Sequence, residues 1–529
     1  MKNVCTALGV CGALAVSASA SIASTISVAS GAELQSAIFT AQPGDTILLV
    51  RGAVYVGNFT LTDKGPSTAV ITIRTAGDDG LAREGERVQP SMAPLLAKIQ
   101  SPNSAPAILT APGAHHWRLM LVEVAGNGGG DLITLGEGSA AQVSLARVPH
   151  DLMLERVYIH GDPLRGQKRG IALNSASTTI TGSYISDIKA VGQDSQAICG
   201  WNGPGPYAIT NNYLEGAGEN LLFGGADPAI PNLVPADITI TGNLFSKPVA
   251  WRSEGWAVEN LFELKNARRV FVAGNVFQYN WEGGQSGYAI LFTVRNQDGG
   301  CPWCQLDHIL FAGNVVAHSG GGIQMLGVDY AHPSQQTNAI VIQNNLFGDI
   351  DSEHWGGNGY FMSILGGPRD ITVDHNTIIS DHGSGVLQAD GPPIFQFRFT
   401  NNLAKHNAYG IIGTGHGVGN DAIGAFFPAS DISTNVFAGG NPGAYPAGNA
   451  FPAPAQFEAQ FMSYTGGDYR LNGASPWHNA GSDGLDLGVV FGGAAAVPVT
   501  SGGTTPSTGD PTSPPQDSAT HQAVDRAPQ

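Results

Sequence analysis

The chain has 529 residues, of which 13% are charged and 72 are glycine, and its formal net charge is −17. This composition favours a turn-rich β structure over a helical bundle. The negative charge disfavours nucleic acid and anionic membranes as partners. It also disfavours a uniformly anionic substrate unless basic side chains gather locally.

The start of the chain has the pattern of a bacterial secretory signal peptide. A positive start at Met1-Lys2 precedes an apolar stretch over residues 4–16 and small residues at 18–20, which suit signal cleavage. We therefore predict residues 1–23 to be a signal peptide and the mature protein to be secreted, either extracellular or periplasmic. No other stretch reaches the roughly 18 apolar residues that a membrane span needs.

The next segment, from about residue 27 to 75, predicts a cap and a first strand. Residues 27–38 include apolar side chains at spacings that suit a short amphipathic helix over the end of a solenoid. Gln42-Pro-Gly-Asp-Thr-Ile then predicts a strand that is entered through a Pro-Gly turn.

Eight short segments between about residues 150 and 440 repeat one pattern, in which two apolar residues at alternate positions are followed by an Asn and another apolar residue. The steps between successive Asn residues are 31, 32, 39, 31, 31, 26 and 33 residues. The repeated Asn residues are Asn212, Asn243, Asn275, Asn314, Asn345, Asn376, Asn402 and Asn435. A period of this length predicts one supersecondary unit stacked many times. Because the unit contains short strands and no helix-period stretch, we predict an all-β fold, a single-stranded right-handed parallel β-helix over residues 24–495.

The repeat also predicts how the coils stack. Residues two apart, such as Ile238 and Ile240, point to one face of a strand and should form apolar ladders inside the solenoid. We expect the Asn residues at the bends, because Asn tolerates left-handed backbone geometry. Their amides should bond to one another along the axis, although eight independent Asn turns would give the same spacing.

A second strand precedes each Asn segment and predicts an outward sheet face. Aligned by sequence, Glu263, Thr293, Gln324, Ser363 and Gln388 form one outward row, and Lys265, Arg295, Leu326, Leu365 and Asp390 form the next. Neighbouring coils lie about 4.8 Å apart, so we expect Lys265 and Arg295 to project side by side. Two cations so close need an anion or carboxylates between them, and Glu219, Glu259 and Glu263 are the candidates.

Aromatic side chains cluster around the same coils. Trp256, Trp281, Trp303 and Tyr288 lie in or beside the loops that flank these strands. Aromatic rings next to a polar strand face suit a glycan-binding groove, with Gln324 as a further polar contact. The alternative is that the rings pack long loops back onto the solenoid.

The remaining features are a cysteine pair and a low-complexity end. Cys301-Pro-Trp-Cys304 lies in a Gly-rich loop without the βαβ pattern of a thioredoxin site, so we predict a disulfide that pins this loop and a free thiol at Cys199. Residues 496–529 are rich in Ser, Thr, Pro and Gly and predict a disordered tail.

The cap followed by Pro-Gly-Asp-Thr-Ile and the Asn-bearing coils resemble the pectin-lyase-like superfamily of parallel β-helix proteins. Within it, Phe262-Glu-Leu-Lys265-Asn and Phe292-Thr-Val-Arg295-Asn resemble the Lys- and Arg-bearing coils of chondroitinase-B-like enzymes and alginate lyases. This resemblance implies β-elimination of a uronate-containing glycan. Lys265 would remove the proton and Arg295 would donate to the leaving oxygen, while Glu219, Glu259 and Glu263 would hold Ca²⁺.

The sequence leaves other functions open. The carboxylates lie at a different spacing before Lys265 than in those lyases, and the loop from Asn275 to Arg295 is too long. Gly413-Thr-Gly-His416-Gly resembles a segment of polygalacturonases, but the acidic motifs of that family are missing. A non-catalytic glycan-binding or adhesion solenoid is the alternative from another class. In each case we expect a monomer that engages polysaccharide.

Overall fold

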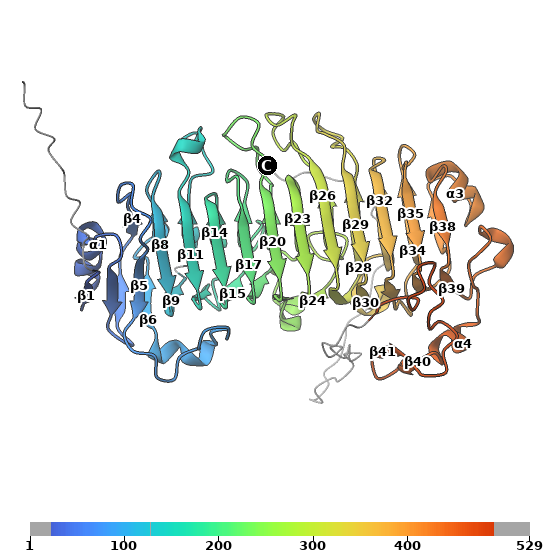
Figure 1. Cartoon of the computed structure of the whole chain (residues 1–529), viewed down its shortest axis with the longest axis horizontal. Coiled ribbons are helices and arrows are strands. Elements are labelled where there is room, and N and C mark those ends of the chain that lie inside the picture. Colours follow the sequence, from blue (N-terminus) through green and yellow to red (C-terminus); the bar gives the residue numbers. More distant parts are fainter. Residues whose placement is uncertain (1–22, 127, 491–529) are drawn as a thin grey trace, which may run out of the picture.

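The protein, described by a computed structural model over residues 23–126 and 128–490, is a right-handed parallel β-helix (Figure 1). Three parallel sheets, A, B and C, run along the solenoid, and the chain visits them in turn. The predicted fold is therefore confirmed. Residues 1–22 of the predicted signal peptide and the predicted tail lie outside the described residues.

The strands are short and stack without interruption along each sheet. Sheet A contains β1 (Thr25–Val28), β2 (Thr46–Leu49), β5 (Ile71–Thr75), β8 (His115–Met120), β11 (His150–Glu155), β14 (Ala176–Thr181), β17 (Tyr207–Thr210), β20 (Ala236–Thr241), β23 (Ala267–Ala273), β26 (Leu306–Ala312), β29 (Asn338–Gln343), β32 (Arg369–Asp374), β35 (Phe397–Thr400) and β38 (Asp431–Ser433). Sheet B contains β3 (Val54–Val56), β6 (Ala97–Gln100), β9 (Val122–Ala125), β12 (Tyr158–His160), β15 (Tyr184–Ile188), β18 (Tyr213–Gly216), β21 (Leu244–Ser246), β24 (Val276–Asn280), β27 (Val315–Ser319), β30 (Leu346–Ile350), β33 (Thr377–Ile378), β36 (Leu403–Lys405) and β39 (Val436–Ala438). Sheet C contains β4 (Phe59–Leu61), β7 (Ile108–Thr110), β10 (Asp131–Leu135), β13 (Arg169–Leu173), β16 (Gln196–Gly200), β19 (Glu219–Phe223), β22 (Asn260–Leu264), β25 (Tyr288–Thr293), β28 (Gly321–Leu326), β31 (Tyr360–Leu365), β34 (Gly385–Asp390) and β37 (Ile411–Gly413).

Helices are few and lie at the ends and in the loops of the solenoid. They are α1 (Gly31–Thr40), α2 (Ser352–Trp355), α3 (Asn420–Phe426), α4 (Pro454–Glu458) and the 3₁₀ turns η1 (Pro90–Leu95), η2 (Leu145–Arg147), η3 (Val249–Ser253) and η4 (Pro442–Ala444). A separate antiparallel pair joins β40 (Phe461–Ser463) to β41 (Asp468–Leu471). None of the helices in the described ranges is long and apolar enough to cross a membrane.

The N-terminal cap is the amphipathic helix that the sequence predicts. Helix α1 buries Leu34, Ala37 and Ile38 and contacts β1, β3 and β4 at the blue end of the solenoid (Figure 1). It covers inward side chains that would otherwise face water at the open end. The stacked strands begin at Thr25, well before the first Asn of the repeat.

The interior is built from the predicted apolar ladders. Ile238, Val270, Ile309, Ile340 and Ile371 lie in register on five successive strands of sheet A, and each is at most 2% exposed. Fully burying a side chain of this size stabilises a fold by about 1.5–3 kcal/mol. Repeating this on every coil gives one continuous core along the solenoid.

The predicted Asn ladder is present. In each step the backbone N–H and the side-chain Nδ2 of one Asn donate to Oδ1 of the next, as from Asn275 to Asn314 (both 3.0 Å). The same pair of bonds recurs at every step from Asn212 to Asn435, where Asn449 takes over as acceptor. Before the repeat starts, the Ser183 hydroxyl accepts the equivalent bond from the Val157 N–H. The ladder therefore satisfies buried amides at one bend of each coil from Asn212 onward.

The backbone at this bend differs from the prediction by one residue. The ladder Asn residues do not have positive φ; the residue immediately before each one does, as at Asn211 (φ 53°), Gly242 (φ 65°) and Asn344 (φ 55°). Gly and Asn suit that preceding position because they enter the left-handed region with the least strain. The ladder Asn is selected by its hydrogen bonds rather than by its backbone conformation.

Candidate functional site

A polar row lies on the outer side of sheet C where β13, β16, β19 and β22 are neighbours. Arg169, Gln196, Glu219 and Asn260 are aligned in register. The Arg169 guanidinium donates two hydrogen bonds to Gln196 Oε1 (3.1 and 2.9 Å). Gln196 Nε2 in turn donates to Glu219 Oε2 (3.0 Å). The row fixes the orientation of Glu219, one of the predicted cation ligands.

The register between β22 and β25 differs from the predicted one by two residues. Glu263 pairs with Leu291, not with Thr293, so the predicted alignment is wrong for Thr293 and Arg295. From Gln324 onward the predicted row is confirmed. A slip of two residues keeps every side chain on its face, because side chains alternate with a period of two. The alternation of apolar residues therefore cannot detect it.

Lys265 and Arg295 nevertheless lie on adjacent coils. The Arg295 N–H donates to the Lys265 carbonyl (2.9 Å). Lys265 Nζ lies 3.6 Å from Glu263 Oε1, and its side chain is 16% exposed. Arg295 is the more open of the two, with a side chain that is 40% exposed. Both cations therefore stand at the edge of sheet C, just beyond the ends of β22 and β25.

Three carboxylates converge beside Lys265 and form what we term the acidic cluster: Asp194, Glu219 and Glu259. Their ligand oxygens all lie within 4.8 Å of one another. Glu259 immediately precedes β22, and Glu219 pairs in register with Asn260. Sequence reasoning missed Asp194, because it lies in the loop before β16 and has no strand-period signal. Only the folded chain brings that loop to the two glutamates.

Burial and the neighbouring charges shift the pKa values of Glu219, Glu259 and Lys265. Burial raises the pKa of Glu219 to about 7, and the charges of Glu263 and Asp194 add to the shift. Burial and the neighbouring Glu219 and Asp194 raise the pKa of Glu259 to about 10. Burial alone would lower the pKa of Lys265, but Glu263 and the acidic cluster outweigh it, so the pKa is raised. The site therefore gathers several carboxyl groups around one ammonium group, and the raised pKa of Glu259 keeps that carboxyl protonated at neutral pH.

Hydrogen bonds hold the carboxylates and leave some oxygens free. Glu263 accepts from the Thr293 hydroxyl (2.6 Å) and from Asn260 Nδ2 (3.0 Å), and Glu259 accepts from Gln285 Nε2 (2.8 Å). Among the described residues, the buried Glu219 Oε1 and Asn260 Oδ1 have no hydrogen-bond partner. Unpartnered buried carboxylate and amide oxygens are the ligand type that Ca²⁺ prefers. The donor set therefore fits a calcium ion held by Glu219, Glu259 and Asp194.

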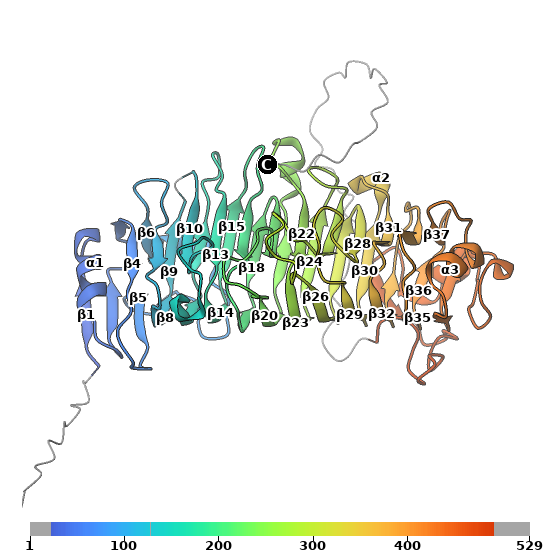
Figure 2. The ribbon, with the colours of Figure 1, turned by 90° about the horizontal axis from the view of Figure 1, so that it is seen from above.

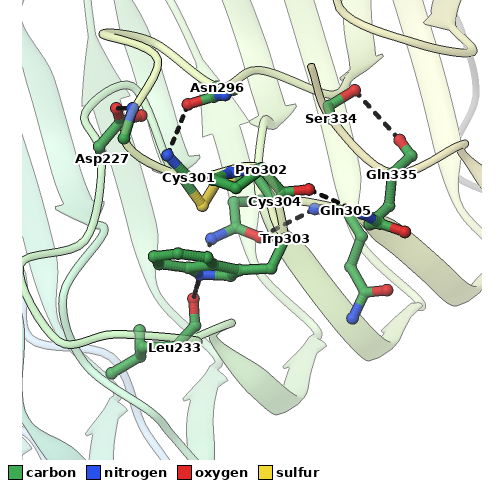
Figure 3. Close-up of a disulfide and its surroundings, with 12 residues drawn as sticks. Asp227, Leu233, Asn296, Cys301, Pro302, Trp303, Cys304, Gln305, Ser334 and Gln335 are labelled. Atoms are coloured by element: carbon green, nitrogen blue, oxygen red, sulfur yellow. Dashed lines mark hydrogen bonds between the residues drawn. A yellow bond between two sulfur atoms is a disulfide. The ribbon is translucent and has the colours of Figure 1, made fainter. Parts of the chain in front are cut away.

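Arg295 lies in the loop after β25 and is anchored by Asp329, which follows β28. Asp329 Oδ1 lies 3.2 Å from the Arg295 guanidinium, and its other oxygen accepts the Asn296 N–H (2.9 Å). Asn296 Oδ1 then accepts the Cys301 N–H (2.7 Å) in the loop that the Cys301–Cys304 disulfide closes (Figure 3). The predicted disulfide is confirmed. It braces the segment that leads away from Arg295.

A buried lysine supports the turn that carries Glu219. Lys247 Nζ donates to the carbonyls of residues 216, 217 and 218 (2.5, 2.9 and 3.0 Å) and to Asn220 Oδ1 (3.0 Å). Burial lowers the pKa of Lys247 to about 7. The ammonium gathers four oxygens around one point and holds the chain on both sides of Glu219.

The aromatic residues are largely buried. Trp281 packs with Trp251 and Trp355 in a side cluster and is 5% exposed, while Trp256 is partly buried at its margin. Tyr288 is 2% exposed, and its hydroxyl donates to Asn358 Oδ1 (3.0 Å). The rings of Trp281 and Tyr288 are therefore closed to sugar stacking, and they hold long loops against the solenoid instead.

Two other predicted residues lie away from the acidic cluster. Trp303 is half-buried beside the disulfide and donates from Nε1 to the Leu233 carbonyl (3.1 Å; Figure 3). Gln324 is half-buried on the outer side of β28, two strands from Glu263 along sheet C.

Cys199 is free and buried, and burial raises the pKa of its thiol to about 11.

Comparisons with solved structures agree with the fold. An alginate lyase of polysaccharide lyase family 6, AlyGC, is 14% identical with a TM-score of 0.51; the alignment covers 81% of this chain and 53% of that one. A mannuronic-acid-specific lyase of the same family from human gut microbiota is 12% identical with a TM-score of 0.50, over 82% of this chain and 93% of that one. The chain thus spans about half the length of the first lyase. No protein-family profile and no curated protein sequence matches it.

Proposed function

We propose that this protein is a secreted enzyme that cleaves a uronate-containing polysaccharide by β-elimination at the outer face of sheet C. The observation that carries the proposal is the arrangement of Lys265 against the acidic cluster, with Arg295 on the adjacent coil. The two solved structures described above are an alginate lyase and a lyase specific for mannuronic acid. Alginate is itself a polymer of uronic acids.

Elimination needs a base, charge neutralisation at the uronate and a donor to the leaving group. The base takes the proton from the carbon next to the carboxyl group, the electron pair forms a double bond, and the bond to the glycosidic oxygen breaks. In the proposed reaction Lys265 Nζ takes the proton. Arg295 donates a hydrogen bond to the departing oxygen, and its ion pair with Asp329 orients it.

The acidic cluster explains why a cation is needed. Its carboxylates repel a uronate and raise the pKa of Lys265, which keeps the ammonium protonated and unable to act as a base. A bound calcium ion would offset two of the negative charges that these carboxylates and the substrate carboxyl group bring together. With those charges offset, Lys265 loses part of the interaction that favours its charged form, which lowers its pKa and makes the neutral amine more accessible.

The test is ultraviolet absorbance of the unsaturated uronate product. Wild-type protein is incubated with alginate, pectate or chondroitin sulfate, with Ca²⁺ or with a chelator. We expect activity on at least one substrate in Ca²⁺ and a loss of about 100-fold or more in Lys265→Ala. Arg268→Ala is the matched control, because this exposed cation lies on sheet A.

Two results would count against the proposal. One is the absence of product from every substrate while the protein is still retained on a uronate column. That outcome would assign the sheet C face to glycan binding without turnover, as in an adhesion solenoid. The other is activity that Lys265→Ala and Arg295→Ala both leave undiminished.

A further inference from the structure

A second group of metal-ligating side chains lies around α2, in the loop from sheet B to sheet C several coils after the acidic cluster. We term it the histidine–aspartate cluster: Asp349, Asp351, His354 and His382. Asp349 is the penultimate residue of β30, the strand before α2 (Figure 2). Asp351 precedes α2, His354 lies within it, and His382 follows β33 on the next coil. Two neighbouring coils therefore contribute side chains to one point.

The ligand atoms of this cluster face one another. Asp351 Oδ2 lies 2.7 Å from His382 Nδ1 and 3.3 Å from His354 Nδ1. Asp349 Oδ1 lies 3.8 Å from the same His354 nitrogen. One ligand atom from each of Asp351, His354 and His382 falls within 4.8 Å of the other two. A single ion with bonds of about 2.0–2.2 Å to nitrogen and oxygen fits such a group after small side-chain shifts.

Both carboxylates are fixed through the oxygen that does not face His354 or His382. Asp351 Oδ1 accepts the N–H groups of Glu353 (2.8 Å) and His354 (2.9 Å). Asp349 Oδ2 accepts from Trp355 Nε1 (2.9 Å) and lies 2.7 Å from His318 Nδ1. Such outer hydrogen bonds orient ligands in metal sites. Each carboxylate is thus held with one oxygen aimed at an imidazole.

A helix cap with an ion pair accounts for only part of this arrangement. The N-terminal cap of α2 uses Asp351 Oδ1, and the ion pair between Asp351 and His382 uses Oδ2. His354 is 60% exposed, yet its Nδ1 turns back toward two carboxylate oxygens instead of solvent. Asp351, in contrast, is 2% exposed. A buried carboxylate that two imidazoles approach from the solvent side is the arrangement expected of a cation site with an open approach.

We propose that Asp351, His354 and His382, with Asp349 as a fourth ligand, bind a late first-row divalent cation such as Zn²⁺. Imidazole nitrogens combined with carboxylates favour these ions, whereas Ca²⁺ and Mg²⁺ prefer oxygen ligands alone. The ion would cross-link α2 to the turn over residues 379–384. It would thereby hold Trp355, which packs with Trp281 and Trp251. This proposal does not depend on the proposed lyase activity.

The test measures Zn²⁺ binding to the chelator-treated full-length chain by competition with a chromophoric chelator. We expect tight binding that His354→Ala and His382→Ala each weaken by at least the 10- to 100-fold typical of outer-shell changes. Their melting temperatures without metal should match wild type, because both rings are at least half exposed. Addition of Co²⁺ should give visible absorption bands that the double variant lacks, and Ca²⁺ should not compete.

A matched control separates this site from another histidine group. His116, His150 and Asp151 also lie within 4.8 Å of one another, at the starts of β8 and β11. His116→Ala/His150→Ala should keep the tight Zn²⁺ site. The proposal is overturned if that control removes tight binding, if His354→Ala/His382→Ala keeps it, or if wild-type protein shows no tight Zn²⁺ binding.

Discussion

The Asn ladder makes a quantitative prediction about stability. Replacing Asn314 with Ala removes four hydrogen bonds: two that its Oδ1 accepts from Asn275, and two that its Nδ2 donates, to the Val272 carbonyl and to Asn345 Oδ1. Asn314 is 1% exposed, so no water replaces them. The two donors of Asn275 are left unsatisfied, at about 1–3 kcal/mol each, which predicts a loss of about 2–6 kcal/mol.

The assay is thermal unfolding followed by circular dichroism. An unfolding entropy of about 2.1 cal/mol/K per residue amounts to about 1 kcal/mol/K for a chain of this length, so we expect the melting temperature to fall by about 2–6 °C. Asn338→Ala is the control, because the Asn338 side chain is half-buried and donates one bond to Asp307; its shift should stay within about 0.5 °C. Equal melting temperatures for the two variants would refute the reasoning.

Three further predictions concern the site. Asp329→Asn should lower turnover by about 10- to 100-fold, because Arg295 loses the charge that orients it; an unchanged turnover would contradict this role. Replacing Cys301 and Cys304 with Ser should cost at most about 2 kcal/mol because the closed loop is short, and a fall of much more than about 2 °C in melting temperature would argue otherwise. In chelator, the melting temperature should fall as pH rises from about 5 to 7, because the raised pKa of Glu219 makes the folded state retain a proton that the unfolded state releases. Glu219→Gln should flatten that profile, and an identical slope in the variant would exclude Glu219 as its source.

The fold could be predicted from the sequence because its determinants repeat. Each of the eight repeats places an Asn at one bend and apolar residues two apart, so that an irregular repeat does not obscure the common pattern. The pairing of Cys301 with Cys304 was also predictable, because the two lie close along the chain. The left-handed residue was misplaced by one position, since Asn211 and Asn212 are adjacent and both residue types suit a bend.

The site was predictable only in outline. Glu219, Glu259 and Lys265 stood out because they flank the outward strands, but Asp194 comes from a loop whose path no periodicity specifies. The register that pairs Glu263 with Leu291 depends on how the long loop before β25 folds. How the loops pack also decides which tryptophans are buried. The sequence alone therefore could not distinguish rings that pack together, such as Trp251, Trp281 and Trp355, from rings that line an open groove.

The most direct test of the central claim is the ultraviolet assay on a single pair of proteins, wild type and Lys265→Ala, with alginate and Ca²⁺. The account predicts that absorbance rises with wild type, that the rise is at least about 100-fold slower in the variant, and that chelator abolishes it. An equal rate in the two proteins would show that Lys265 and the acidic cluster are not the elimination site.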